Sequence, residues 1–263
     1  MQIVVCVKQV PDTGEVKIDK ETNTLIREGV PAIINPFDTH AIAEAIKIKK
    51  EQGGTVTVVT MGPKQAEEAL KESIALGVDQ VRHLCDSAFA GSDTWATSVT
   101  LTAAIRKLEP IDLVICGRQA IDGDTAQVGP GTAELLSIPH VTNVRKIEVL
   151  EDGRSCRVER LTDDGYEVLE VQAPLLITVV REINQPKMPS LRGMMKAKKA
   201  DIPIWGHRDL GLEPEEIGLQ GSPTWVNKVF SPEAVQTEGE IFSGTTEENA
   251  EYLRDVLKKV KAF

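Results

Sequence analysis

The chain is poor in aromatic residues, in cysteine and in long apolar runs. Only 4% of its 263 residues are aromatic, which is too few for a platform on which nucleic-acid bases stack. The net charge of −10 argues against a nucleic-acid backbone as the main partner, because phosphate backbones are bound by Lys and Arg. No apolar stretch is long enough to span a bilayer, and the first eight residues lack the charged segment of a signal peptide. We therefore expect a soluble cytoplasmic protein without membrane insertion.

The four cysteines, Cys6, Cys85, Cys116 and Cys156, lie far apart. There is no Cys-x-x-Cys or His-x-x-x-His pair, so no metal site is expected. Three of the cysteines lie in apolar or alternating runs, which favours buried thiols over disulfides. Hydrophobic residues make up 41% of the chain, enough for the core of one large domain with or without an appendage.

Apolar, β-branched runs recur through the first 180 residues. They are typical of strands buried on both faces, as in a parallel sheet, and they occupy residues 3–7, 55–61, 81–85, 111–116 and 175–180. Helical patterns follow the first four runs, at residues 39–52, 66–74, 93–108 and 132–136. The alternation predicts an α/β fold with a doubly wound, mostly parallel, Rossmann-like sheet of the kind that binds adenine nucleotides.

The pattern changes after Pro139. Three segments of alternating residues, 144–150, 155–161 and 166–171, are separated by Glu-Asp-Gly and Asp-Asp-Gly. Such spacing predicts an antiparallel meander attached to the parallel sheet.

The last 63 residues lack the alternating strand and helix patterns of the rest of the chain. Residues 201–263 form an extended arm with little periodicity, which could not fold alone, and an amphipathic helix is expected at 246–260. We therefore expect an α/β nucleotide-binding domain over 1–200 and a C-terminal arm over 201–263 that packs on a partner.

The segment 117–130, Gly-Arg-Gln-Ala-Ile-Asp-Gly-Asp-Thr-Ala-Gln-Val-Gly-Pro, lies between a predicted strand and a predicted helix. A loop entering a helix offers free backbone N–H groups and the positive end of the helix dipole, which suit a phosphate. Gly117, Gly123 and Gly129 let the backbone approach a ligand closely. The alternative is an ordinary polar turn with Asp124 or Thr125 as helix cap, since the spacing is neither G-x-G-x-x-G nor a P-loop.

Two other loops are candidates for the same site, because ligands of open α/β sheets bind near the carboxyl ends of the strands. Residues 8–12 follow the first strand, and Asn35 precedes a helix for which Asp38 is the expected N-cap. A surface turn and a plain helix cap explain these residues equally well.

Residues 184–199 place two prolines before a short helical segment rich in Lys. Leu191, Met194 and Met195 would be partly exposed beside these cations, which indicates a docking surface. The alternative is a helix that lies on its own domain with solvated lysines.

Together these features resemble the β subunit of electron-transfer flavoproteins over nearly the whole chain. Residues 158–169, Val-Glu-Arg-Leu-Thr-Asp-Asp-Gly-Tyr-Glu-Val-Leu, with Pro174 and Leu-Ile-Thr at 176–178, resemble the family signature in order and spacing. Leu191 with Met-Lys-Ala-Lys-Lys at 195–199 is similar to the family's recognition loop, whose leucine anchors onto acyl-CoA dehydrogenases. The residues next to Leu191 differ from the mammalian form, which leaves the partner surface open to change.

The resemblance also implies where a nucleotide binds. The positions carried over are Cys6, Asn35, Pro36, Phe37, Asp38, Met61, Gly117, Arg118, Gln119, Ala120, Ile121, Asp122, Gly123, Asp124, Thr125, Ala126, Gln127 and Val128. Those implied for partner docking are Leu191, Met195 and Lys196.

Residues 122–130 resemble the bifurcating, NADH-dependent branch of the family, in which a second FAD takes the position that AMP has in mammalian members. Gly123 and Ala126 are small, which would help the larger ligand fit. The implied protein is a heterodimer with an α subunit, on which the C-terminal arm packs. FAD in the β subunit would accept electrons from NADH, sending one to ferredoxin or flavodoxin and the other, through the α-subunit FAD, to an acyl-CoA dehydrogenase.

On this reading the chain is an electron-carrier subunit that is redox-active only with its α subunit, and no residue is expected to act as a general acid or base. The alternative is a non-bifurcating β subunit that holds AMP as a structural ligand. A third hypothesis, a nucleotide hydrolase or adenylating enzyme, would need a motif such as Ser-Gly-Gly-x-Asp-Ser, which the sequence lacks.

Overall fold

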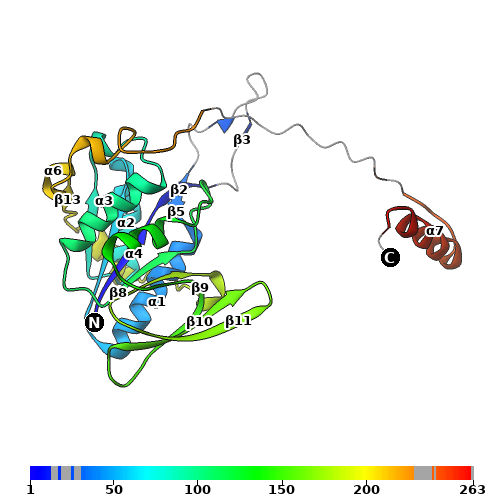
Figure 1. The fold of residues 1–263 in the computed structure, drawn as a ribbon, viewed down its shortest axis with the longest axis horizontal. Helices are drawn as coiled ribbons and strands as arrows, with labels where there is room; N and C mark the ends of the chain where they lie inside the picture. Colours follow the sequence, from blue (N-terminus) through cyan, green and yellow to red (C-terminus); the bar gives the residue numbers. More distant parts are fainter. Residues whose placement is uncertain (13–16, 19–24, 27–30, 228–238, 240, 262–263) are drawn as a thin grey trace. The chain divides into compact units, whose positions relative to one another are not determined.

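The computed structural model describes residues 1–12, 17–18, 25–26, 31–227, 239 and 241–261 (Figure 1). The chain forms two compact units, residues 1–228 and residues 229–263. Among the described residues, none of the helices combines the length and the apolar character that crossing a bilayer requires.

The first unit is built on one nine-stranded sheet, in the order β11-β10-β9-β12-β8-β1-β6-β7-β13. The strands are β1 (Gln2–Val7), β6 (Thr55–Met61), β7 (Gln80–Leu84), β8 (Leu113–Gly117), β9 (His140–Val149), β10 (Ser155–Thr162), β11 (Gly165–Gln172), β12 (Leu175–Val179) and β13 (Ile204–Trp205). Neighbours from β9 to β13 are parallel, whereas β9, β10 and β11 pair antiparallel. The predicted doubly wound sheet with an attached meander is therefore confirmed.

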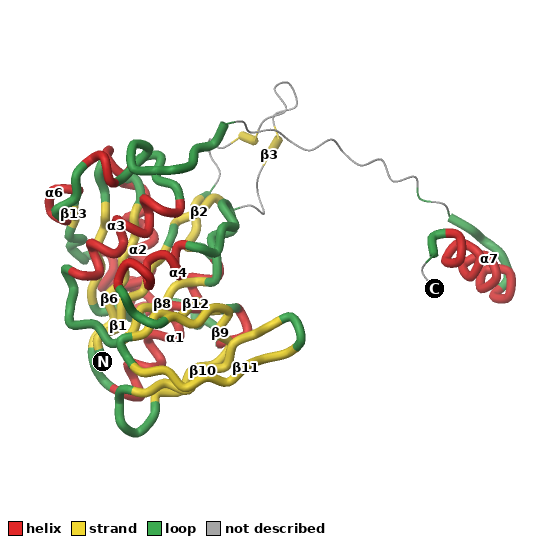
Figure 2. Tube along the Cα trace, viewed as in Figure 1, coloured by secondary structure: helices red, strands yellow, loops and turns green. Residues whose placement is uncertain are grey.

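Helices cover both faces of this sheet (Figure 2). They are α1 (Pro36–Gln52), α2 (Glu67–Leu76), α3 (Thr94–Arg106), α4 (Val128–Leu136), α5 (Leu191–Lys198) and α6 (His207–Leu210). Odd residues of β1, such as Val5, pack in the core that α1 and α2 cover. Even residues, such as Val4, pack in the core that α3 and α4 cover. Successive residues of a strand face opposite sides, so a β-branched run buried on both faces is what this architecture requires.

The predicted cap Asp38 and the caps of the alternative interpretation, Asp124 or Thr125, are wrong. Helix α1 begins at Pro36, with Asn35 as an N-cap that makes no side-chain cap bond. Asp38 therefore lies within the first turn of α1. Pro36 is well tolerated as the first helical residue, and the Asp38 carboxylate accepts hydrogen bonds from other loops. Helix α4 begins at Val128 after Gln127, so neither Asp124 nor Thr125 caps it.

Other local predictions are confirmed. Asp93 caps α3 by accepting a hydrogen bond from the Ala96 N–H at 3.0 Å. All four cysteines are free thiols, and Cys6, Cys116 and Cys156 are buried.

Short elements complete the first unit. They are the paired strands β2 (Gln9–Pro11) and β5 (Ala32–Ile34), the paired strands β3 (Lys17–Ile18) and β4 (Leu25–Ile26), and the 3₁₀ turns η2 (Lys64–Ala66), η3 (Ser87–Phe89), η4 (Arg181–Ile183) and η5 (Pro214–Glu216). The antiparallel pair β3 and β4 is what the alternating residues 16–19 and 24–27 predict for a hairpin, and the residues 19–24 that connect the two strands lie outside the described residues.

The described residues after 200 divide between the two units. Within the first unit, β13 adds a strand beside β7, and Ile217 is fully buried against the core that α3 and α4 cover. Within the second unit, α7 (Thr246–Lys259) starts with a capping box formed by Thr245 and Glu248. None of the described residues of α7 is buried.

Candidate functional site

A cavity of about 410 Å³ lies at the carboxyl ends of β1, β6 and β8. The chain runs outward from β1 through β6 to β7 and then returns to the other side of β1 as β8. The order of strands thus reverses between β1 and β8. Open α/β sheets bind their ligands in the crevice that such a reversal creates.

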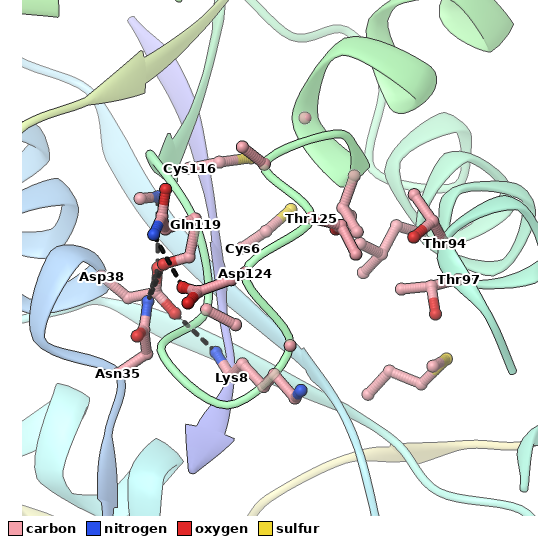
Figure 3. A pocket seen from close by; sticks show the side chains of 18 of the residues that line it. Cys6, Lys8, Asn35, Asp38, Thr94, Thr97, Cys116, Gln119, Asp124 and Thr125 are labelled. Atoms are coloured by element: carbon pink, nitrogen blue, oxygen red, sulfur yellow. Dashed lines mark hydrogen bonds between the residues drawn. The ribbon is translucent and has the colours of Figure 1, made fainter. Parts of the chain in front are cut away.

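The cavity has a floor and two walls (Figure 3). Cys6 and Cys116, buried residues near the carboxyl ends of β1 and β8, lie between the walls. One wall is the 117–128 loop with Asn35 and Asp38 behind it. The opposite wall is the start of α3, which the sequence did not assign to the site.

Asn35 and Asp38 tie three loops together at the first wall. The Asp38 carboxylate accepts hydrogen bonds from the Lys8 N–H at 2.7 Å, the Gly117 N–H at 3.2 Å and the Asn35 side-chain amide at 3.0 Å. Asn35 also donates to the Gln119 carbonyl at 2.8 Å and accepts from the Ile121 N–H at 3.1 Å. The polar atoms of this pair therefore hold the ends of β1 and β8 and the loop after β8 in fixed positions. We call Asn35, Asp38 and these hydrogen bonds the frame.

Burial is the dominant influence on the ionisation of Asp38. It raises the pKa of the carboxyl group from 3.8 to about 7, although the hydrogen bonds from Asn35, Lys8 and Gly117 act in the opposite direction. A carboxyl group without water around it disfavours its charged form. The frame therefore carries an ionisable group that titrates near neutral pH.

Gly117 is required by this close approach. A Cβ atom at this position would collide with the Asp38 carboxylate and with Phe37. By contrast, a Cβ atom at Gly123 would meet no atom within 4 Å. The two glycines of the loop thus have different roles, because only Gly117 is needed to bring β8 against the start of α1.

Charged and polar contacts shape the rest of the loop. The Lys8 ammonium lies 2.7 Å from both carboxylate oxygens of Asp122, and Gln119 donates to Asp124 at 2.7 Å. Asp124 and Ala126 have positive φ angles of 51° and 56°. Non-glycine residues seldom adopt this conformation, and functional loops are where it concentrates.

The two thiols on the floor are neighbours. Cys6 and Cys116 are paired in register across β1 and β8. The contact with Cys6 and then burial raise the pKa of Cys116 well above its usual value of 9.0. Cys116 is thus a neutral thiol at physiological pH, which makes this part of the floor polarisable and uncharged.

The opposite wall joins residues that are far apart in the sequence. It consists of Ser92, Asp93, Thr94, Thr97 and Leu101 with Thr224. Thr224 is held by Asp93, which accepts its N–H at 3.0 Å and its hydroxyl at 2.7 Å. The helix start at residues 92–94 was visible in the sequence, but no pattern marked Thr224.

Most residues predicted to bind a nucleotide do line this cavity: Cys6, Asn35, Asp38, Met61, Gly117, Arg118, Gln119, Ala120, Gly123, Asp124, Thr125, Ala126 and Val128. The cavity lining does not include Pro36, Phe37, Ile121, Asp122 or Gln127. Lys8, from the candidate loop 8–12, and Gly129, from the segment 117–130, also line it. The remaining lining residues were not assigned to the site from the sequence: Val7, Ser92, Asp93, Thr94, Thr97, Leu101, Cys116 and Thr224.

The residues left out of the lining make other contacts or lie at the ends of helices. The Phe37 ring is 5.1 Å from the Arg181 guanidinium, and Asp122 pairs with Lys8. Pro36 begins α1 and Gln127 precedes α4, while the Ile121 N–H binds Asn35. No group of three or more His, Cys, Asp or Glu side chains suited to a metal ion occurs in the described part of the chain.

The predicted docking residues lie elsewhere, on α5. Leu191 and Met195 are 79% and 64% exposed. Ala197 is buried, Lys196 reaches the Val78 carbonyl at 3.4 Å, and a Cβ atom at Gly193 would collide with the Ala75 carbonyl. One side of α5 is thus pressed against α2, and Leu191 and Met195 project into solvent. We use the name docking surface, after its predicted role, for Met188, Leu191, Met194, Met195 and Lys196.

The fold and the cavity define a doubly wound α/β protein with a cavity at its topological switch point. The model of the electron transfer flavoprotein domain matches residues 22–210. The chain is 54% identical over 247 residues to the caffeyl-CoA reductase-Etf complex subunit CarD of Acetobacterium woodii, which spans 94% of this chain and 93% of CarD. It is 52% identical over 258 residues to electron transfer flavoprotein subunit beta of Thermoanaerobacterium thermosaccharolyticum, with 98% of both chains covered.

A further relative is protein FixA of Azotobacter vinelandii, which is 44% identical over 246 residues and covers 92% of this chain and 88% of its own. The chain belongs to the electron transfer flavoprotein family, as a β subunit. The resemblance identified from residues 117–130, 158–178 and 191–199 is confirmed at this level.

Proposed function

We propose that this chain binds FAD in the cavity at the ends of β1, β6 and β8, as the β subunit of a heterodimeric electron transfer flavoprotein. The FAD would accept electrons from NADH and pass them to two acceptors. One is ferredoxin or flavodoxin, and the other is an acyl-CoA dehydrogenase reached through the FAD of the α subunit. The flavin supplies the redox chemistry, and the protein supplies binding, orientation and electrostatics.

The observation that carries this proposal is the frame built by Asn35 and Asp38. It presents the 117–128 loop to the cavity with the N–H groups of Thr125 and Ala126 free of hydrogen bonds within the described chain. Helix α4 begins directly after these residues. Free amides at a helix start suit the phosphates of a nucleotide. Gly117, whose Cβ position is filled by its neighbours, shows that the loop is held closely against α1.

The residues present fit an adenine dinucleotide. The loop residues from Gly117 to Val128 would hold the phosphates and sugar through backbone groups, while Cys6, Met61 and Cys116 offer an uncharged floor. Asn35 and Asp38 would act through the frame, because their polar atoms already bind the protein. Backbone N–H groups near the ring system would stabilise a negatively charged flavin.

The partners follow from the surfaces and from the relatives. The name of CarD describes it as a subunit of a caffeyl-CoA reductase-Etf complex. This name supports an oxidoreductase of CoA thioesters as an electron acceptor for this chain as well. The docking surface would contact the acyl-CoA dehydrogenase through Leu191, Met195 and Lys196. The α subunit would bind the C-terminal arm, including the exposed α7. Such a complex would work in the cytoplasm.

Cofactor content tests the proposal directly. The chain is purified with its α subunit, the cofactors are released by denaturation, and FAD and AMP are quantified per heterodimer. Two FAD and no AMP are expected. One FAD and one AMP would instead show the non-bifurcating β subunit with a structural nucleotide. A control with Lys49→Gln, far from the cavity, should leave both counts unchanged.

A further inference from the structure

Hydrogen bonds fix the backbone of Lys8, whereas its side chain is about half exposed and held by an ion pair. Its N–H donates to Asp38 at 2.7 Å and its carbonyl accepts the Asn35 N–H at 2.9 Å. Lys8 lines the cavity, and its ammonium lies 2.7 Å from both oxygens of Asp122, which itself is outside the lining. The position of the backbone is therefore set by the frame, whereas the ammonium is held by an ion pair at the rim.

This ion pair is weak enough to be exchanged. The side chains of Lys8 and Asp122 are 48% and 31% exposed. Pairs of this exposure shift an equilibrium about fivefold at most, because water screens them and ordering two side chains has an entropic cost. A phosphate carries more charge than a carboxylate and offers more acceptor oxygens. An ammonium group that can reach both will prefer the phosphate.

The charges around the cavity explain why a cation is needed. Asp93 and Asp124 line the cavity, Asp38 adds a carboxyl group that is partly ionised near neutral pH, and against them the described lining contains Lys8 and Arg118. An anionic ligand entering among these carboxylates requires compensation that the backbone amides supply only in part. The Lys8 ammonium is already at the rim, and the exchange moves no backbone atom.

We propose that Lys8 is a specificity-determining residue that turns from Asp122 to a phosphate of the bound nucleotide, and that Asp122 competes with the ligand for it. This inference rests on the proposed nucleotide site and adds a role that is separate from the amide-rich loop. It makes two predictions of opposite sign, because removing the cation and removing its competitor should change affinity in opposite directions.

The first test compares ligands with and without phosphate. Full-length chain, shown by its absorbance spectrum to be free of nucleotide, is titrated by calorimetry with AMP, adenosine, FAD and riboflavin. Lys8→Gln should weaken AMP and FAD about tenfold, the usual scale of a hydrogen bond to a charged group, and leave adenosine and riboflavin unchanged. Lys8→Arg, which keeps the charge, should restore most of the AMP affinity.

The second test removes the competitor. Asp122→Asn should bind AMP about threefold more tightly than wild type, with adenosine unchanged. Lys49→Gln is the matched control for Lys8→Gln, since it breaks the Lys49–Asp79 ion pair of 2.9 Å away from the cavity and removes the same single positive charge. Its AMP affinity should equal that of wild type. Added salt should weaken AMP binding to wild type more than to Lys8→Gln.

Four results would overturn the inference. Equal losses for AMP and adenosine in Lys8→Gln would mean that the residue acts through the shape of the site. Unchanged AMP affinity in Lys8→Gln, or weaker binding in Asp122→Asn, would remove the exchange itself. Wild-type protein that binds none of the four ligands would overturn the proposed function together with this inference. The other results would overturn only the role of Lys8, because wild type would still bind the nucleotide.

Discussion

Asp38 makes the stability of the protein depend on pH in a predictable direction. Its pKa is about 7 in the folded chain and 3.8 for an ordinary aspartate. The folded state therefore holds a proton that the unfolded state has released, over the range from about pH 4 to pH 7. Stability contributed by this group is complete below pH 4 and is lost as the pH rises through 7.

The size of the effect follows from the shift. One pKa unit corresponds to about 1.36 kcal/mol, so the ionised carboxylate lowers the free energy of unfolding by about 4 kcal/mol above pH 8. Between pH 5 and pH 7 the change is about 2 kcal/mol. Asp38→Asn carries no charge at any pH and keeps the size of the side chain. It should lack this component of the pH dependence.

Urea unfolding, followed by far-ultraviolet circular dichroism at pH 5, 6, 7 and 8, measures the difference. The free energy of unfolding of wild type minus that of Asp38→Asn should fall by about 2 kcal/mol from pH 5 to pH 7. Asp152→Asn is the control: hydrogen bonds from Ser155 and the Arg154 N–H lower the pKa of Asp152 to about 2, so its ionisation changes only below this range. Parallel curves for wild type and Asp38→Asn would refute the assignment of a buried, proton-binding carboxyl group.

Two further predictions concern the loop and the docking surface. Gly117→Ala should lower the free energy of unfolding by about 1–3 kcal/mol, the usual cost of overpacking, and weaken nucleotide binding, whereas Gly123→Ala has open space around its Cβ position and should leave the free energy of unfolding unchanged; equal losses of stability in urea unfolding would contradict the close approach of β8 to α1. Leu191→Ala should slow electron delivery to the acyl-CoA dehydrogenase several-fold and leave flavin content and NADH oxidation by dyes intact, with Val168→Ala on β11 as an exposed control; unchanged coupling in stopped-flow assays would remove the docking assignment.

The fold was predictable because its main signals are local. Runs such as residues 3–7 and 55–61 are β-branched and apolar, and helical periods separate them, so the parallel sheet follows from pattern alone. The alternating segments after Pro139 identified the meander in the same way. Helix starts were less predictable. Asn35 and Asp38 are both good caps by propensity, and the choice between them was made by tertiary hydrogen bonds to the ends of β1 and β8.

One of the two walls of the candidate site was predictable from the sequence. Glycine, small polar residues and a following helix mark the 117–128 loop, whatever surrounds it. The second wall has no such mark, because Thr97 and Thr224 come together only through the fold. Lys8 is a similar case: its proximity to Asp122, 114 positions away, is a property of the sheet edge.

The amino-acid sequence by itself determined the order of strands and helices, the family, and the loop that offers amides to a ligand. These depend on periodicity and on backbone preferences, which act over a few residues. Only the tertiary structure decided that Asp38 is a buried proton-binding group, that Lys8 is shared between Asp122 and the cavity, and that a second wall faces the loop. Burial and charge proximity depend on distances between remote segments, and those distances exist only once the chain has folded.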